Sequence, residues 1–288
     1  MFARGRDLLT SADGGTTVLG NAALELTIAY TSQRGIVAIS CDPPVDALEQ
    51  LVGVRASTGF RQAVDDALPG ERQSGSLRFQ LLDDVPTAAL VSGYALGAGG
   101  VHAPRSELAL QQADLCAGWA TGATILTDIE INGRPPVVTG PEAPSIETPE
   151  DAWGWHEVAL LPAHGMRRRR RLDVWRENDG DHELGRVDGF FRDSHMDANG
   201  CETVVHEYGI SASIDLETMQ FNACDASVGA LPWVECPVAA ASAGRLVGAP
   251  ADGLRTWVRN TFLGPTTCTH LNDTLRSLED VPALLASL

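Results

Sequence analysis

The stretch LVGAPADGLRTWVRNTFLG, residues 246–264, sets the organisation of the whole chain, because a diverged version of it occurs earlier. The earlier version is LVGVRASTGFRQAVDDALPG, residues 51–70. Both begin with Leu-Val-Gly, continue through a glycine into an amphipathic run, and end on another glycine. Repeated units dictate how a fold is assembled, so they are sought first. We interpret the pair as the centre of an internal duplication.

Helical spacing supports this interpretation. In the first copy, Phe60, Val64 and Leu68 are spaced i, i+4 and i+8, which places them on one helix face. The second copy repeats this spacing with Leu254, Val258 and Phe262. Further along, LDDVP at 82–86 matches LEDVP at 278–282. The alternative is chance similarity between two amphipathic helices.

Short runs rich in β-branched residues predict antiparallel hairpins ahead of each helical group. One of them has Asn199-Gly200 at its tip, which is a strong hairpin signal. Residues 123–131 predict a further strand, and residues 133–150, dense in Pro and Gly, predict a long loop. The predicted hairpin strands are 24–30 with 36–41, 187–191 with 202–208, and 210–216 with 219–224.

Strands that cluster in hairpins and helices that come in groups are typical of an α+β protein. We expect an antiparallel sheet or a partial barrel, built from two diverged repeats, with helices packed outside. Three domains are expected. They are a degenerate first repeat (1–100), a connecting strand and long Pro/Gly loop (101–165), and a second repeat that bears the candidate site (166–288).

Charge and composition exclude several classes of function. The net charge of −17 over 288 residues repels nucleic-acid phosphates and anionic membrane surfaces. All 21 basic residues are arginine, and arginine can neither form a Schiff base nor replace the lysine of a P-loop. Pyridoxal-phosphate enzymes, lysine-dependent aldolases, P-loop NTPases and protein kinases are therefore excluded.

The six cysteines are widely spaced and include no Cys-x-x-Cys pair, which is typical of reduced thiols. The first residues lack the apolar stretch of a signal peptide, and no window is long and apolar enough to span a bilayer. We expect a cytoplasmic protein. Its expected partner is a small-molecule substrate, with no nucleic acid and no membrane, and a homo-oligomer is compatible with the sequence.

Reactive side chains are concentrated in the second copy, within GPTTCTHLND at 264–273. Cys268 and His270 lie at a predicted helix start, which Thr267 or Thr269 would cap. The helix dipole favours a thiolate or an anionic group there, and the matching part of the first copy lacks both Cys and His. A buried structural cysteine is the alternative. The predicted binding residues are Cys268, His270, Asn272, Asp273, Arg192 and Arg276.

A second concentration lies on the hairpin that has Asn199-Gly200 at its tip. Alternation along a strand places His206 and Tyr208 on one face and Glu207 on the other. A carboxylate beside a histidine can orient a general base, and a tyrosine can donate a proton. A polar, solvated hairpin face is the alternative. The predicted catalytic residues are His206, Glu207, His195, Asp193 and Tyr208.

We expect no cofactor, with zinc as the alternative. A zinc site needs about four ligands, and no spacing in this sequence is diagnostic of one. The candidate zinc ligands are Cys236, Cys268, His270 and His206.

The arginine run at 167–171 leads into a predicted strand at 172–175. In so acidic a chain we expect these arginines to pair with carboxylates. Binding of a small anion or of nucleic acid are the alternatives.

Several of these motifs resemble the bacterial DUF2889 proteins, a domain of unknown function. The resemblance covers roughly residues 166–288, and its most specific element is Cys-Thr-His-Leu at 268–271. It implies no particular activity. The segments that carry it are 166–175, Phe190-Phe191-Arg192-Asp193, His206-Glu207-Tyr208, Glu235-Cys236-Pro237 and Cys268-Thr269-His270-Leu271.

Histidines, carboxylates and a tyrosine, without a redox fingerprint or any lysine, favour general acid–base catalysis. We expect a small-molecule enzyme, namely a lyase that adds or removes water next to a carbonyl. His206 or His195 would move the proton, and Asp193 or Glu207 would orient it. The alternatives are a hydrolase or transferase that uses Cys268 as nucleophile, and a non-catalytic ligand-binding protein.

Overall fold

The computed structural model describes residues 1–30, 33–101, 112–180 and 182–288. The chain divides into two compact units, each with its own buried apolar core. Each unit therefore gains stability from burying its own side chains. The N-terminal unit comprises Met1–Ser92, Pro149–Glu157 and Ser287, and the C-terminal unit comprises Gly93–Thr148, Val158–Ala286 and Leu288.

The N-terminal unit is built on an antiparallel sheet with the strand order β1-β2-β3. Along β2, the buried residues Ala22, Leu24 and Leu26 alternate with less buried ones, so one sheet face turns towards the core. The hairpin predicted at 24–41 is confirmed, although Thr31 and Ser32 of its turn lie outside the described residues. The strands are β1 (Phe2–Thr10), β2 (Thr16–Ala29) and β3 (Gly35–Asp42).

The helices of the N-terminal unit bury their apolar stripes in the same core. Phe60 and Val64 of α1 lie in one cluster with Leu24 of β2, so the predicted helical spacing is confirmed. Helix α3 continues from this unit into the C-terminal unit. These elements are η2 (Asp46–Leu51), α1 (Phe60–Ala67), α2 (Leu77–Asp83), α3 (Val85–Ala98) and η4 (Pro149–Asp151).

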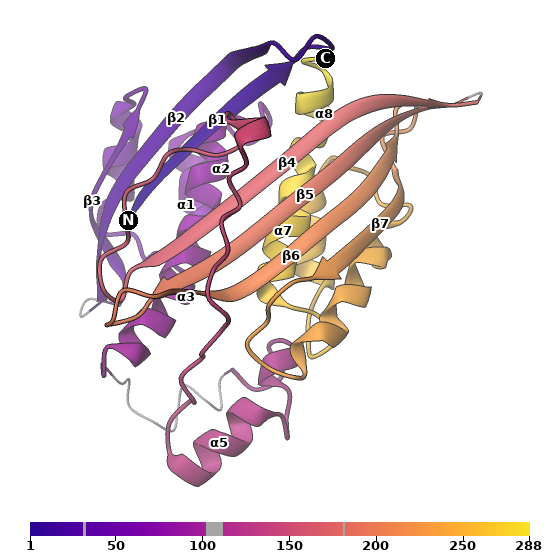
Figure 1. Cartoon of the computed structure of the whole chain (residues 1–288). Coiled ribbons are helices and arrows are strands. Elements are labelled where there is room, and N and C mark those ends of the chain that lie inside the picture. The colour runs from indigo at the N-terminus through magenta and orange to yellow at the C-terminus, as the bar shows by residue number, and fades with distance from the viewer. Residues whose placement is uncertain (31–32, 102–111, 181) are drawn as a thin grey trace. The chain divides into compact units, whose positions relative to one another are not determined.

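The C-terminal unit is built on a longer antiparallel sheet with the order β4-β5-β6-β7 (Figure 1). The pairing of β5 with β6 and of β6 with β7 confirms the predicted hairpins in this half. Neither sheet is closed, so the α+β class with antiparallel sheets is confirmed in its open form. The strands are β4 (Met166–Asp179), β5 (His182–Met196), β6 (Glu202–Asp215) and β7 (Phe221–Val228).

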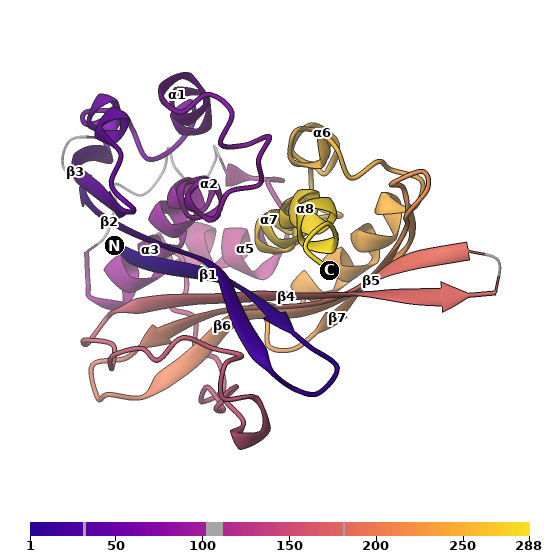
Figure 2. The same ribbon diagram turned by 90° about the horizontal axis from the view of Figure 1, so that it is seen from above.

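Helices α6, α7 and α8 lie together on one face of this sheet (Figure 2). Val187, Tyr208 and Ile210 of the strands share one core with Leu254 of α6 and Leu271 of α7. We call this side of the sheet the helix-covered face. The helical elements of the unit are η3 (Ala117–Trp119), α5 (Thr124–Asn132), η5 (Cys236–Leu246), α6 (Leu254–Thr261), α7 (Thr269–Ser277), η6 (Leu278–Asp280) and α8 (Val281–Leu285).

Residues 133–148, which we call the strap, contain no helix or strand, as the Pro- and Gly-rich composition predicts. The strap pairs with the first part of β6: Val204 N–H donates to Pro141 O at 2.9 Å, and Ala143 N–H donates to Glu202 O at 2.8 Å. The strap is therefore an ordered segment whose backbone polar groups are paired with the sheet.

The two halves share a specific loop geometry. Gly53 N–H donates to Ile36 O at 2.8 Å, and Gly248 N–H donates to Phe221 O at the same distance. Both glycines have φ near +84° (85° and 83°), a conformation that side chains disfavour. The Leu-Val-Gly elements therefore fulfil the same structural role in both units.

An ion pair also recurs between the halves. Arg61 Nε lies 2.6 Å from Asp83 Oδ1, and Arg255 Nη1 lies 3.4 Å from Glu279 Oε1. The four residues hold corresponding positions in the two similar stretches of sequence. These matches are what a duplication predicts. The predicted domain boundaries at 100 and 165 stay a prediction.

The strand predicted at 123–131 is wrong, because these residues belong to helix α5. Their β-branched side chains favour a strand locally. However, Glu235 Oε1 accepts hydrogen bonds from the backbone N–H (2.9 Å) and the hydroxyl (2.8 Å) of Thr124, which caps the first turn. Gly133 then ends the helix with φ 69°. A contact between residues distant in sequence overrides the local preference.

Among the described residues, no helix combines the length and the apolar character needed to cross a bilayer.

Candidate functional site

Three neighbouring strands place a row of polar side chains on the helix-covered face. Arg168 of β4 lies directly opposite Asp193 of β5, which lies directly opposite His206 of β6. Residues directly opposite one another in antiparallel strands project their side chains to the same face. The row forms beside a β-bulge, where Ser194 pairs with Val204 and Val205 is the extra residue.

Helix α7 adds the remaining polar groups. His270, Asp273 and Arg276 are spaced i, i+3 and i+6, so they share one face of the helix. The ring of His270 stacks on the ring of His206, with centroids 3.6 Å apart and planes inclined by 20°. His270 Nε2 lies 4.0 Å from Asp193 Oδ2. We call Asp193, His206 and His270 the histidine cluster.

A chain of ion pairs holds the carboxylate of the cluster in place. Arg168 donates from Nε and Nη2 to the two oxygens of Asp193, each at 2.9 Å. Its Nη1 donates to Asp273 Oδ2 at 2.7 Å, and Arg276 Nη1 donates to Asp273 Oδ1 at 2.9 Å. Bidentate pairs of this kind fix orientation as well as distance. We call these four residues the ionic chain; the two acids balance its two arginines.

Buried polar atoms without a partner mark the cluster. His206 Nδ1 and His270 Nε2 have no hydrogen-bond partner among the described residues, and the Tyr208 hydroxyl beside them has the Cys268 thiol as its hydrogen-bonding neighbour. The three side chains belong to residues that are only 2%, 7% and 0% exposed. Leaving such an atom unsatisfied costs about 1–3 kcal/mol. Two such nitrogens in one place favour a site that binds a ligand.

Burial sets the protonation states at the site. It lowers the pKa of His206 well below its usual value, and the neighbouring His270 adds to this. Burial, with the positive charge of Arg168, lowers the pKa of His270 to about 3. Burial also raises the pKa of Tyr208. At neutral pH both imidazoles are therefore uncharged and the phenol keeps its proton.

Cys268 differs from the prediction in two ways. It is itself the N-cap residue of α7, and its side chain makes no capping hydrogen bond; Thr267 and Thr269 do not cap the helix either. Burial raises the pKa of its thiol, although the Tyr208 hydroxyl and the first backbone N–H groups of α7 act in the opposite direction, so the thiol keeps its proton. Its Sγ lies 3.8 Å from His270 Nδ1, so the thiol is a neighbour of the cluster.

Two of the predicted residues, Arg192 and Glu207, lie on the other face of the sheet. Arg192 Nε donates to Glu207 Oε2, and its Nη1 donates to Pro144 O of the strap at 2.6 Å. The structure therefore does not bring Glu207 or Arg192 to the histidine cluster. They attach the strap to the sheet.

His195 and Asn272 lie outside the cluster as well. His195 shares the face of Asp193, but its ring is next to the ring of His164, with centroids 5.9 Å apart. Burial lowers the pKa of His195. Asn272 Nδ2 donates to Phe262 O at 2.9 Å, which links the start of α7 to the end of α6.

The zinc ligands suggested by sequence are assembled only in part. His206 and His270 come together, but their third neighbour with a ligand atom is Asp193. Neither Cys236 nor Cys268 belongs to a group of three or more such residues within the described part of the chain. All six cysteines are free thiols.

Sequence reasoning missed two residues of the site, Arg168 and Tyr94. Arg168 lies in the arginine run, and only its pairing with β5 distinguishes it from its neighbours. The ring of Tyr94, near the end of α3, contacts His206 edge-on with centroids 5.8 Å apart. No motif in the sequence indicates this contact.

The arginine run pairs with carboxylates, as its position in an acidic chain predicts. Alternation sends Arg168 to the helix-covered face and sends its two neighbours to the other face. The ion pairs are Arg167 with Glu202, Arg168 with Asp193 and Asp273, Arg169 with Glu147, and Arg171 with Asp173.

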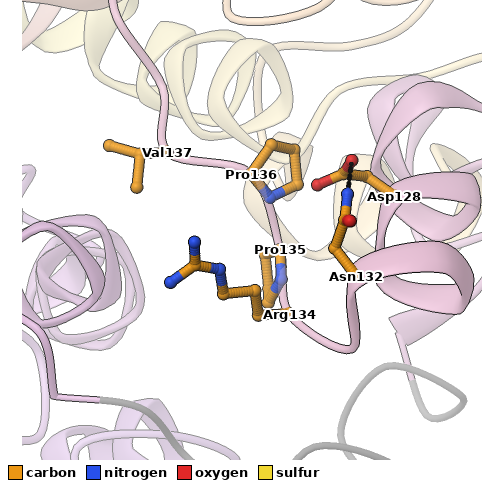
Figure 3. Close-up of a pocket in the computed structure, with 6 residues that line it drawn as sticks. All are labelled: Asp128, Asn132, Arg134, Pro135, Pro136 and Val137. Atoms are coloured by element: carbon orange, nitrogen blue, oxygen red, sulfur yellow. Dashed lines mark hydrogen bonds between the residues drawn. The ribbon is translucent and has the colours of Figure 1, made fainter.

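A surface pocket of about 450 Å³ lies elsewhere in the C-terminal unit, at the end of α5 (Figure 3). In Figure 3, Asn132 Nδ2 donates a hydrogen bond to Asp128 Oδ1 at 2.6 Å, and the Arg134 side chain extends away from this pair. No residue of the histidine cluster lines this pocket. Its lining residues are Asp128, Asn132, Arg134, Pro135, Pro136 and Val137.

The sequence model of a family described as "Protein of unknown function (DUF2889)" fits part of the second half of the chain. Residues 166–284 match DUF2889. The match confirms the predicted resemblance, and this DUF2889 region contains the histidine cluster and the whole ionic chain. No curated protein and no solved structure matches the chain.

Proposed function

We propose that the protein is a small-molecule enzyme whose reaction centre is the histidine cluster of the DUF2889 region. The observation that carries the proposal is a pair of buried ring nitrogens, on His206 and His270, that have no hydrogen-bond partner in the described part of the chain and lie beside a carboxylate fixed by Arg168. Polar atoms that no protein group satisfies are available to a substrate and to a water molecule.

We propose a lyase reaction, in which water is added to or removed from a carbon–carbon bond next to a carbonyl. In the addition, the water oxygen bonds to one carbon, and the carbon next to the carbonyl receives a proton. The cluster binds the water, takes up its proton and returns one proton to the carbon next to the carbonyl. The uncharged hydroxyl of Tyr208 donates a hydrogen bond to the carbonyl oxygen as negative charge develops there.

The state of Cys268 supports this reaction over a thiol nucleophile. A thiol attacks as the thiolate, and burial raises the pKa of this one. The cysteines also support a cytoplasmic location, because all of them are free. The negative net charge favours a small molecule, rather than nucleic acid or a membrane surface, as the partner.

The test starts from binding. Small organic acids, ketones and thioesters are screened for compounds that raise the melting temperature of the full-length protein. Each compound that does so is then incubated with the protein in D2O and followed by mass spectrometry. The expected result is a compound that gains or loses one water molecule and takes up deuterium next to its carbonyl.

Two variants connect the turnover to the cluster. Asp193→Asn and His206→Gln are expected to lower the rate by about 100-fold or more, as removal of an acid–base group does. Asp188→Asn is the matched control, because it makes the same change on an exposed residue of the same strand. A compound that binds but is never converted would show instead a non-catalytic ligand-binding protein. Equal rates in Asp193→Asn and Asp188→Asn would remove the cluster from the reaction.

A further inference from the structure

The histidine cluster has the composition of a metal site. Asp193, His206 and His270 each offer one ligand atom, and these atoms all lie within 4.8 Å of one another. All three residues are buried. They come from β5, β6 and α7, so the core of the C-terminal unit holds them in place. Two imidazoles and one carboxylate form a set that binds divalent transition metals, with positions left open for other ligands.

The unpartnered ring nitrogens point to the ligand. His206 Nδ1 and His270 Nε2 belong to residues that are more than nine-tenths buried, and neither nitrogen has a protein partner among the described residues. The other nitrogen of His270, Nδ1, lies 3.4 Å from Thr269 Oγ1 and 3.8 Å from Cys268 Sγ. Those neighbours favour the tautomer with the proton on Nδ1, which leaves the Nε2 lone pair free for a metal.

The carboxylate of Asp193 can also act as a metal ligand. Arg168 donates to both oxygens of Asp193, but each carboxylate oxygen keeps a further lone pair. Hydrogen bonds to ligating carboxylates orient them in metal sites. Ligands at about 2.0–2.1 Å from one zinc ion lie within roughly 4.2 Å of each other. The rings of His206 and His270 are stacked in this structure, so metal binding requires one ring to turn out of the stack until both lone pairs point at the same ion.

We propose that Asp193, His206 and His270 bind one divalent transition-metal ion of the zinc class, through one carboxylate oxygen, Nδ1 and Nε2 respectively. The remaining coordination positions take water and substrate. A metal ion lowers the pKa of its bound water and so supplies hydroxide at neutral pH. The three side chains then act as ligands: the metal-bound water gives its proton to solvent before its oxygen bonds to carbon, and the carbon next to the carbonyl takes up a proton from solvent.

The positive charge of a bound metal ion indicates which class of substrate the site would favour. In the ionic chain the two acids balance the two arginines, so a divalent ion adds positive charge to a buried site. Such a site favours anionic ligands. A small carboxylic acid or its enolate therefore fits better than a neutral ketone. This step rests on the proposed function, whereas metal binding itself does not.

The experiment measures metal binding by the full-length protein after removal of metals with a chelator. The protein is titrated with Zn²⁺ alone and with Co²⁺ alone, and the bound metal is counted by elemental analysis. One ion per chain is expected. Co²⁺ is expected to give visible d–d absorption without a thiolate charge-transfer band, because no cysteine is a ligand. Failure of the wild-type protein to bind one ion would overturn the proposal without recourse to any variant.

Variants assign the ligands. His206→Gln, His270→Gln and Asp193→Asn are each expected to weaken binding by more than about 100-fold, which exceeds the usual effect of residues that only support a ligand. His164→Asn is the matched control, because His164 also has an unpartnered ring nitrogen but lies outside the cluster. Asn also tolerates its positive φ of 61°. Equal losses in His164→Asn and His206→Gln, or a thiolate band removed by Cys268→Ser, would contradict the assignment.

The two proposals fail in different ways. Turnover by the metal-free protein would overturn the part of the metal in the reaction and leave the lyase reaction standing, whereas failure to bind one ion would overturn the metal site itself. Binding of one ion by these three ligands, without turnover of any stabilising compound, would confirm the metal and remove the reaction.

Discussion

His206 and His270 are buried as uncharged imidazoles, and this has a cost that depends on pH. Burial lowers the pKa of both rings in the folded protein. In the unfolded chain a histidine has a pKa of about 6.5. Between that value and the lower folded value, the unfolded chain binds more protons than the folded one. Stability is therefore full above about pH 6.5 and falls as the pH decreases.

We predict that the free energy of unfolding of the metal-free protein falls between about pH 6.5 and pH 5. Each of these histidines contributes a slope of up to about 1.4 kcal/mol per pH unit. Denaturant unfolding followed by circular dichroism at several pH values measures this slope. In His270→Gln the slope is expected to be smaller by the contribution of one histidine, up to about 1.4 kcal/mol per pH unit. An unchanged slope in that variant would mean that His270 charges freely in the folded protein.

Individual residues of the site could be predicted to different extents. Strand alternation placed His206 and Tyr208 on the face opposite to Glu207, and the structure agrees. The absence of Cys and His from the first copy directed attention to His270. Arg168 could not be singled out, because its role depends on the strand paired beside it. The exclusion of Glu207 and Arg192 depends on their contact with the strap, which the sequence does not reveal.

Among the elements, the strap depends on a very close approach at Gly140. A Cβ atom at this position would lie 1.7 Å from the carbonyl oxygen of Val204, which is backbone and cannot move aside. The strap therefore pairs with β6 only because residue 140 has no side chain.

We predict that Gly140→Ala releases this part of the strap from β6. Loss of the two backbone hydrogen bonds from Val204 and Ala143 would cost about 1–3 kcal/mol. Limited proteolysis should show faster cleavage within the strap. Gly97→Ala is the control, because a Cβ there meets no atom within 4 Å. Equal protease resistance of Gly140→Ala and the wild type would contradict the close approach.

Elements defined by local signals were predictable, and those defined by tertiary contacts were not. The Asn-Gly turn and the alternating strands around it predicted β5 and β6. Helix α1 and helix α6 followed from i, i+4 spacing. Helix α5 was predicted as a strand, because the cap that fixes its first turn comes from Glu235.

At the scale of the whole molecule, the chain has two cores in which corresponding residues are fully buried. Phe60 and Leu254 hold the same position in α1 and α6, and both are 0% exposed. Each belongs to the core of its own unit. The α+β class and its hairpins could be read from the sequence, because the repeated stretches keep their order. The exact division into two compact units could not be read from the sequence, because it depends on tertiary contacts.

We predict that scanning calorimetry resolves two unfolding transitions. Phe60→Ala should lower the free energy of unfolding of the N-terminal unit by about 3–5 kcal/mol. Leu254→Ala should lower that of the C-terminal unit by about 2–5 kcal/mol. Each variant serves as the control for the other. A single transition that both variants shift equally would show one cooperative molecule.

The extra residue at Val205 decides which chemical groups enter the interior of the DUF2889 region. Pairing continued regularly from Ser194 and Val204 would bring His206 opposite Arg192 and turn Tyr208 to the strap side. Glu207 would then point into the core instead. A longer hairpin tip at 197–201 would not cause this exchange, since it lies between the last paired residue of β5 and the first paired residue of β6. We therefore expect related proteins to keep the β-bulge at Val205 as strictly as they keep His206, whose side chain it directs into the core.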